Sequence, residues 1–65
     1  MNTILNGKPV DVAADKLEEL LVELGYADAV GATAVNEDFV PKDRRAAVSV
    51  KPGDRLEVVA PLRGG

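Results

Sequence analysis

Residues 16–25 read Lys-Leu-Glu-Glu-Leu-Leu-Val-Glu-Leu-Gly, and this stretch decides how the chain can fold. Its leucines stand at positions i, i+3, i+4 and i+7, the spacing that puts side chains on one face of an α-helix: Leu17, Leu20, Leu21 and Leu24. Asp15 suits the N-cap, with Glu18 in a capping-box position, and Gly25 suits the residue that ends the helix. Because isolated helices this short are marginal, the leucine face must pack against another element.

The sequence before this helix predicts a β-hairpin. Thr3-Ile4-Leu5 is a short apolar run, and Asn6-Gly7 follows it as a strong hairpin signal because both residues tolerate positive φ. Residues 8–12 then read as the return strand. Pro9 has no backbone N–H, so this second strand is expected at a sheet edge.

The sequence after the helix predicts further strands. Residues 33–36 read as a strand, Glu37-Asp38 as its turn and residues 39–40 as a short return strand. Residues 42–45 read as a solvated charged loop. Pro52-Gly53 fits the two central positions of a type II turn, and residues 56–60 alternate as a final strand.

The order of these elements is hairpin, helix and then more strands, which is an α+β pattern with one helix covering one face of a sheet. The helix leucines supply one half of the expected core. The expected sheet contribution is Ile4, Val10, Val12, Val35, Val48, Leu56 and Val58.

Length and composition restrict the class of protein. The chain has 65 residues, 46% hydrophobic and 29% charged, which is typical of one globular domain over residues 1–65. It contains no Cys and no His, which removes thiolate metal sites and the commonest general base. So short a chain leaves little room for a deep substrate pocket, and we therefore expect a protein that is not an enzyme.

The same numbers give expectations about location and partners. A small domain without disulfides is typical of the cytoplasm, and no apolar run approaches the ~20 residues that span a bilayer. The net charge of −3 argues against binding to nucleic acid, which relies on Lys and Arg. We expect a cytoplasmic monomer that does not bind membranes.

Gly64-Gly65 is the most informative feature for function. Without side chains, two glycines can extend through a channel too narrow for other residues, with the Gly65 carboxylate as the group presented. A carboxylate is a poor electrophile, so another protein would have to activate it, for example by adenylation. We expect residues 61–65 to form a flexible tail, because they have little apolar area to bury.

Several short motifs together resemble those of the ThiS family of sulfur carriers, which have the ubiquitin-like β-grasp fold. The motifs are Leu5-Asn6-Gly7, the 17–25 helix, Ala34-Val35-Asn36, Val40-Pro41, Gly53-Asp54 and Gly64-Gly65. The resemblance covers essentially the whole chain. It implies a mixed sheet of four to five strands packed on one main helix.

The resemblance also implies a mechanism for thiamin thiazole biosynthesis. An E1-like enzyme, ThiF, uses ATP and Mg²⁺ to adenylate the Gly65 carboxylate, and a sulfur donor protein displaces AMP to leave a thiocarboxylate. The sulfur then passes to the thiazole synthase ThiG. Gly64 would thread the partner's channel, and the chain itself would bind no cofactor and no metal.

Three alternative functions remain open. The chain could be the small subunit of molybdopterin synthase, a sulfur carrier of another pathway, or a β-grasp module that only binds a partner and carries no sulfur. Val59 should lie on the face opposite Leu56 and Val58, so Val59, Leu62 and Arg63 are the candidate docking residues beside the tail. Turn chemistry accounts for Asp38 and Asp43 without a metal site.

Overall fold

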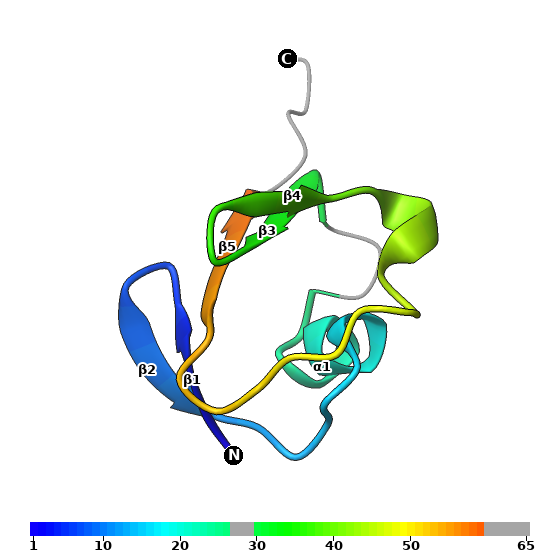
Figure 1. The fold of residues 1–65 in the computed structure, drawn as a ribbon. Coiled ribbons are helices and arrows are strands. Elements are labelled where there is room, and N and C mark those ends of the chain that lie inside the picture. The colour runs from blue at the N-terminus through cyan, green and yellow to red at the C-terminus, as the bar shows by residue number, and fades with distance from the viewer. Residues whose placement is uncertain (27–29, 60–65) are drawn as a thin grey trace.

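A five-stranded mixed sheet and one α-helix form the described part of the chain, residues 1–26 and 30–59 of a computed structural model (Figure 1). The strands are β1 (Asn2–Leu5), β2 (Lys8–Asp11), β3 (Ala32–Val35), β4 (Asp38–Val40) and β5 (Arg55–Val59). Their order across the sheet is β2-β1-β5-β3-β4. Of the four strand pairs within these described ranges, β1–β5 alone is parallel. The helices are α1 (Leu17–Glu23) and the 3₁₀ turn η1 (Lys42–Arg44). The predicted α+β class is confirmed, with β2 at an edge.

Both hairpins close through two-residue turns whose residues have positive φ. In the β1–β2 turn Asn6 has φ 48° and Gly7 φ 84°, as expected for an Asn-Gly type I′ turn. In the β3–β4 turn Asn36 has φ 50° and Glu37 φ 73°. The predicted turn Glu37-Asp38 is therefore wrong by one residue, because the register pairs Asp38 with Val35.

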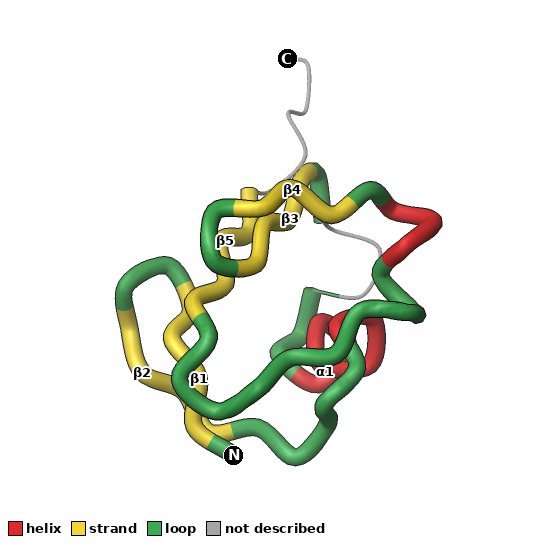
Figure 2. The backbone as a smooth tube through the Cα atoms, in the orientation of Figure 1, coloured by secondary structure: helices red, strands yellow, loops and turns green. Residues whose placement is uncertain are grey.

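The two ends of α1 are stabilised by different kinds of hydrogen bond. Asp15 is not the N-cap as predicted: Lys16 is, and no side chain caps it. Carbonyls of the segment that precedes β5 accept instead, with Leu17 N–H donating to Val48 O at 2.9 Å and Glu18 N–H to Arg45 O at 3.2 Å. Figure 2 shows this segment running along α1. A neighbouring backbone has thus satisfied the N–H groups that a capping side chain would otherwise bind.

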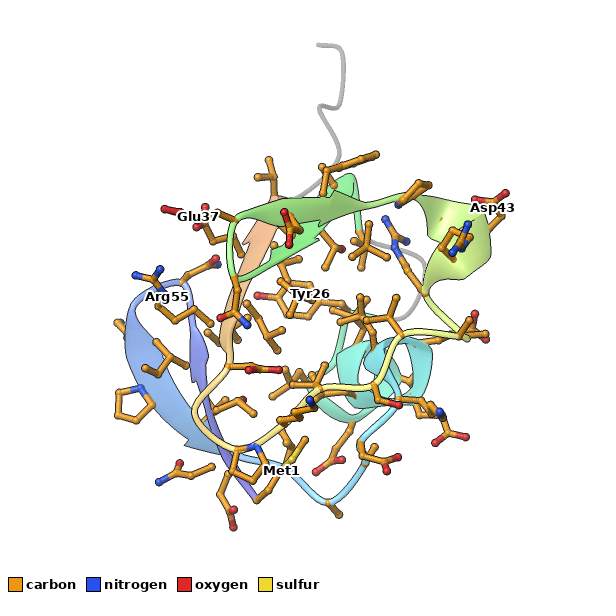
Figure 3. The ribbon with its side chains drawn as sticks, in the orientation of Figure 1. Met1, Tyr26, Glu37, Asp43 and Arg55 are labelled. Carbon is orange, nitrogen blue, oxygen red and sulfur yellow. The ribbon has the colours of Figure 1, made fainter. Side chains whose placement is uncertain are left out.

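At the other end of α1 the prediction for Gly25 is confirmed. Its φ is 90°, its N–H donates to Val22 O at 3.0 Å, and Tyr26 N–H donates to Leu21 O at 2.9 Å. This is a Schellman motif, which satisfies the last helix carbonyls. Tyr26 then points into the space between the sheet and α1 (Figure 3).

The core lies between α1 and the inner face of the sheet. Its buried hydrophobic residues are Val12, Leu17, Leu20, Leu21, Val40, Val50, Leu56 and Val58. Leu24, Val10, Val35 and Val48 pack against them while partly buried. The prediction for Ile4 is wrong: Thr3, 1% exposed, takes the inward position in β1, and strand alternation turns Ile4 to the outer face.

The segment before β5 also departs from expectation. Residues 42–45 are not a wholly solvated loop, because η1 forms there and Arg45 is 8% exposed. The Arg45 Nε has no hydrogen-bond partner within the described ranges. The Pro52-Gly53 turn is confirmed, since Gly53 has φ 86° and Asp54 N–H donates to Lys51 O at 3.0 Å.

Candidate functional site

The candidate site begins where β5 ends. β5 is the central strand, paired with β1 on one side and with β3 on the other. Six residues follow Val59 in the sequence, so Gly65 can lie at most about 20 Å away from it. Gly64 and Gly65 themselves lie outside the described residues, as do Leu62, Arg63 and the whole predicted tail 61–65. β5 therefore fixes the point from which the last residues depart.

Val59 lies on the outer face of the sheet, as predicted, with 61% of its surface exposed. β5 alternates, so Leu56 and Val58 face the core while Glu57 and Val59 face outward. Register places Ala32 beside Val59. The last described residue of the strand is thus an exposed apolar side chain.

Phe39 extends this apolar area across the neighbouring strands. It is 67% exposed and pairs with Ala34 of β3, which pairs in turn with Glu57 of β5. We call the apolar side chains of this region the outer-face patch: Ala32, Ala34, Phe39 and Val59. Large exposed apolar patches on small proteins are often interaction surfaces. The patch adjoins the residue that leads into the tail.

Two shallow hollows flank Phe39. One, of about 110 Å³, lies over the outer-face patch and Glu57. The other, of about 290 Å³, is lined by Phe39, Val40, Pro41, Arg44 and Val48. Ligand pockets generally measure roughly 300–1,000 Å³, so the first hollow is well below that range and the second only reaches its lower limit.

The side chain of Asn6 binds the end of β5. Its Oδ1 accepts from Val58 N–H at 2.9 Å, and its Nδ2 donates to Val58 O at 3.2 Å. Sequence reasoning used Asn6 only as a turn residue and missed this role. No local signal could have revealed it, because Asn6 and Val58 stand 52 positions apart.

A second asparagine binds the opposite end of β5. Asn36 Oδ1 accepts from Arg55 N–H at 2.9 Å, and its Nδ2 donates to Asp54 Oδ1 at 3.0 Å. The Lys51 N–H donates to Asp54 Oδ2 at 2.8 Å. The bonds from Lys51 and then from Asn36 hold the pKa of Asp54 below its usual value, because they favour the carboxylate.

The described residues contain neither a cluster of metal ligands nor a membrane-spanning helix. In residues 1–26 and 30–59, no three carboxylates gather in a way that could hold a metal ion. Asp38 and Asp43 lie apart at exposed positions of β4 and η1. No helix in these ranges is long and apolar enough to cross a membrane.

Comparison with known proteins assigns the family. The model of the ThiS family matches residues 3–65. The chain belongs to the ThiS family. This confirms the resemblance to the ThiS family seen in the sequence.

Solved structures agree with the ThiS assignment. The crystal structure of the thiamine biosynthesis protein ThiS from Geobacter metallireducens has 31% identity and a TM-score of 0.78, with 100% of each chain covered. An NMR structure of a thiamine biosynthesis protein from the same organism has 36% identity and a TM-score of 0.79, covering 100% of this chain and 88% of that one. The expected β-grasp fold, with its mixed sheet on one helix, is thereby confirmed.

One curated relative of this ThiS-family chain is much longer. It is a thiazole synthase from Paramagnetospirillum magneticum (strain AMB-1), 39% identical over 66 residues. The match covers 100% of this chain but only 20% of that protein. A ThiS-like sequence thus occupies a fifth of a protein named for thiazole synthesis.

Proposed function

We propose that the chain carries sulfur on its Gly65 carboxylate for the synthesis of the thiamin thiazole. The match to ThiS proteins along the whole chain carries this proposal. The position of β5 supports it, because the central strand of the sheet ends at Val59, only six residues before Gly65. The names of the solved relatives favour the thiamin pathway over the small subunit of molybdopterin synthase.

The chemistry needs two steps on one carboxylate group, the first at its oxygen and the second at its carbon. A Gly65 carboxylate oxygen attacks the α-phosphorus of ATP in an E1-like partner, and the acyl-adenylate forms as pyrophosphate leaves. A sulfide-level nucleophile from the donor then adds to the Gly65 carbonyl carbon, and the C–O bond to AMP breaks. The partner supplies ATP and Mg²⁺, while this chain supplies the reacting carboxylate.

The thiazole synthase is the acceptor in this proposal. The thiazole synthase of Paramagnetospirillum magneticum contains a ThiS-like stretch in the same chain, which favours a synthase of this kind as the acceptor. We propose that this chain docks on a ThiG-type synthase after sulfur loading. The outer-face patch would bind ThiF during adenylation and the synthase after sulfur loading, with Val59 at the end of β5.

Mass spectrometry tests the chemistry. Incubation with ThiF, Mg-ATP and sulfide should replace one oxygen by sulfur in the C-terminal peptide. Deleting Gly65, or adding a residue after it, should abolish the product because the carbonyl must reach the nucleotide within about an ångström. Gly64→Leu should fail as well, since a side chain would obstruct the channel. Equal modification of the shortened chain would remove Gly65 from the reaction and refute the carrier proposal.

A pair of valines tests the docking surface. Val59 on the sheet and Val22 on α1 are each 61% exposed, so Val59→Lys and Val22→Lys make the same chemical change on different faces. We expect Val59→Lys to weaken binding to ThiF at least tenfold, because it puts a charge into an apolar contact. Val22→Lys should leave the affinity within about twofold. Equal affinities would show that the outer-face patch is not the docking surface.

A further inference from the structure

The backbone of β5 is paired unequally along its two sides. On the β3 side the pairing runs to the end, with Thr33 opposite Val58 and Ala32 opposite Val59. On the β1 side only Ile4 and Leu5 pair with β5, opposite Arg55 and Leu56. Because the chain turns away at Asn6, the backbone groups of Val58 face a gap in the ladder. An unpaired stretch at this place would let the end of β5 fray.

The Asn6 side chain fills that gap as a substitute for a peptide group. The backbone N–H of Asn6 continues the ladder by donating to Leu56 O at 2.8 Å. Its carboxamide then offers one acceptor and one donor to the N–H and C=O of Val58, at 2.9 and 3.2 Å. A primary amide has the same donor and acceptor as the peptide bond that it replaces. β5 is thus held from both sides up to Val58.

We propose that Asn6 is a positioning residue for the sulfur-carrier reaction, acting through β5 on the point where the tail departs. The inference rests on the proposed function, and extends it to a residue at the far end of the sequence. By binding Val58, Asn6 holds Val59 within the outer-face patch. It also fixes the end of the strand that precedes the Gly64-Gly65 end, so that the patch and the Gly65 carboxylate engage one partner together.

Asn36 supplies a matched control within the same molecule. It also has a positive φ in a two-residue turn, and its side chain also accepts from a β5 N–H, that of Arg55. It holds the start of β5, away from the tail. We call the side-chain hydrogen bonds from each asparagine to β5 its clamp. Because glycine adopts positive φ freely, Asn6→Gly and Asn36→Gly each remove one clamp and keep the turn.

The first experiment compares steady-state adenylation by ThiF with these variants as substrates. Asn6→Gly should raise the KM for the carrier about tenfold, the order expected when two hydrogen bonds that order a binding segment are lost. Its kcat should stay unchanged, because the reacting groups are intact once bound. Asn36→Gly should leave both constants within about twofold. An unchanged KM for Asn6→Gly, or an equal rise for both variants, would overturn the proposal.

Hydrogen exchange checks the physical cause without any enzyme. Asn6→Gly should speed exchange of the Val58 amide about tenfold or more and spare the Arg55 amide, while Asn36→Gly should do the reverse. If the wild-type chain is not adenylated at all, the proposed function fails while the exchange result still stands. If wild-type activity is present but Val58 exchange is unchanged, the clamp itself is refuted.

Asn6→Asp provides a second variant in case Asn6→Gly folds poorly. An ionised carboxylate can accept from Val58 N–H but cannot donate to Val58 O. Protonating that carboxyl restores a donor. The exchange of Val58 relative to Arg55 should therefore be fast at neutral pH and slow again in mild acid, after correction for intrinsic rates. A ratio that does not depend on pH would contradict the role of the donated bond.

Discussion

The two hairpins share one design and differ in what they hold. Each closes with an asparagine at positive φ, and each asparagine reaches β5 with its side chain. The first hairpin has Gly7 as its second turn residue and binds β5 near its end, at Val58. The second has Glu37 there and binds β5 at its start, at Arg55. The same local device thus acts at opposite ends of the strand that leads to Gly65.

The different positions of the two clamps predict which substitutions affect stability alone and which also affect function. Both clamps add hydrogen bonds to the sheet, so both should contribute to stability. The Asn6 clamp binds Val58, next to Val59 at the end of β5, whereas the Asn36 clamp binds Arg55 at the start of that strand. Backbone strain also differs between the two turns, because positive φ is free of strain at Gly7 and strained at Glu37. Substitutions in the two hairpins can therefore isolate each effect.

Leu56→Ala should cause the largest loss, because it removes what both hairpins share. Leu56 is 1% exposed and lies between Leu5 of the first hairpin and Val35 of the second. Large-to-small core changes cost about 2–5 kcal/mol, most of the stability of so small a domain. Denaturant unfolding measures the loss. Val59→Ala, on the exposed face of the same strand, should cost less than about 0.5 kcal/mol.

Asn6→Gly and Asn36→Gly should each lower the free energy of unfolding by about 1–2 kcal/mol, through lost hydrogen bonds and added chain entropy. Urea unfolding of the two variants tests whether the clamps are alike in stability. If the free energies of unfolding of the two variants differ by more than about 1.5 kcal/mol, the two clamps do not contribute equally to stability. The KM comparison would then need correction for the folded fraction.

Glu37→Gly should stabilise the protein by about 0.5–1 kcal/mol. Glycine relieves the left-handed strain of roughly 1–2 kcal/mol and gives back part of this gain as chain entropy. Gly7→Glu makes the reverse change in the first hairpin, where no atom lies within 4 Å of an added Cβ. It should destabilise by a similar amount. Thermal unfolding of both variants tests this symmetry, which fails if both shifts have the same sign.

The smallest expected effect is on the pKa of Asp54. Lys51 and Asn36 lower that pKa in the folded state, so the carboxylate contributes stability above the unfolded pKa and loses it as pH falls through the folded one. Asn36→Gly should move the pKa of Asp54 upward, and Asn6→Gly should not change it. NMR titration of the Asp54 carboxyl measures both. An unmoved pKa in Asn36→Gly would show that the Lys51 bond alone sets it.

Local sequence signals predicted the elements well where the cause is local. The leucine spacing located α1, Asn6-Gly7 located the first turn, and Pro52-Gly53 located the turn before β5. The prediction failed where a distant segment decides the outcome. The backbone of residues 45–48 satisfied the helix N-terminus that Asp15 was expected to cap, and strand register turned Ile4 outward in favour of Thr3.

The candidate site was predicted only in part. Alternation along β5 correctly exposed Val59. The role of Gly64-Gly65 stays a prediction, because these residues lie outside the described part of the chain. Phe39 was missed as a surface residue, although its neighbour Val40 is buried and alternation would have turned Phe39 outward. Asn6 could not have been found, because its partner Val58 is brought near only by the parallel pairing of β1 with β5.

That parallel pairing has a consequence for the order of folding. β5 follows every other described element in the sequence yet lies at the centre of the sheet, between the two hairpins. Before β5 docks, the hairpins have no strand in common, and contacts of such long sequence separation form slowly. A chain caught at that stage would expose Gly65 without an assembled patch. An activating enzyme that requires both would thus discriminate against unfinished molecules, and the central place of β5 would act as a check on folding.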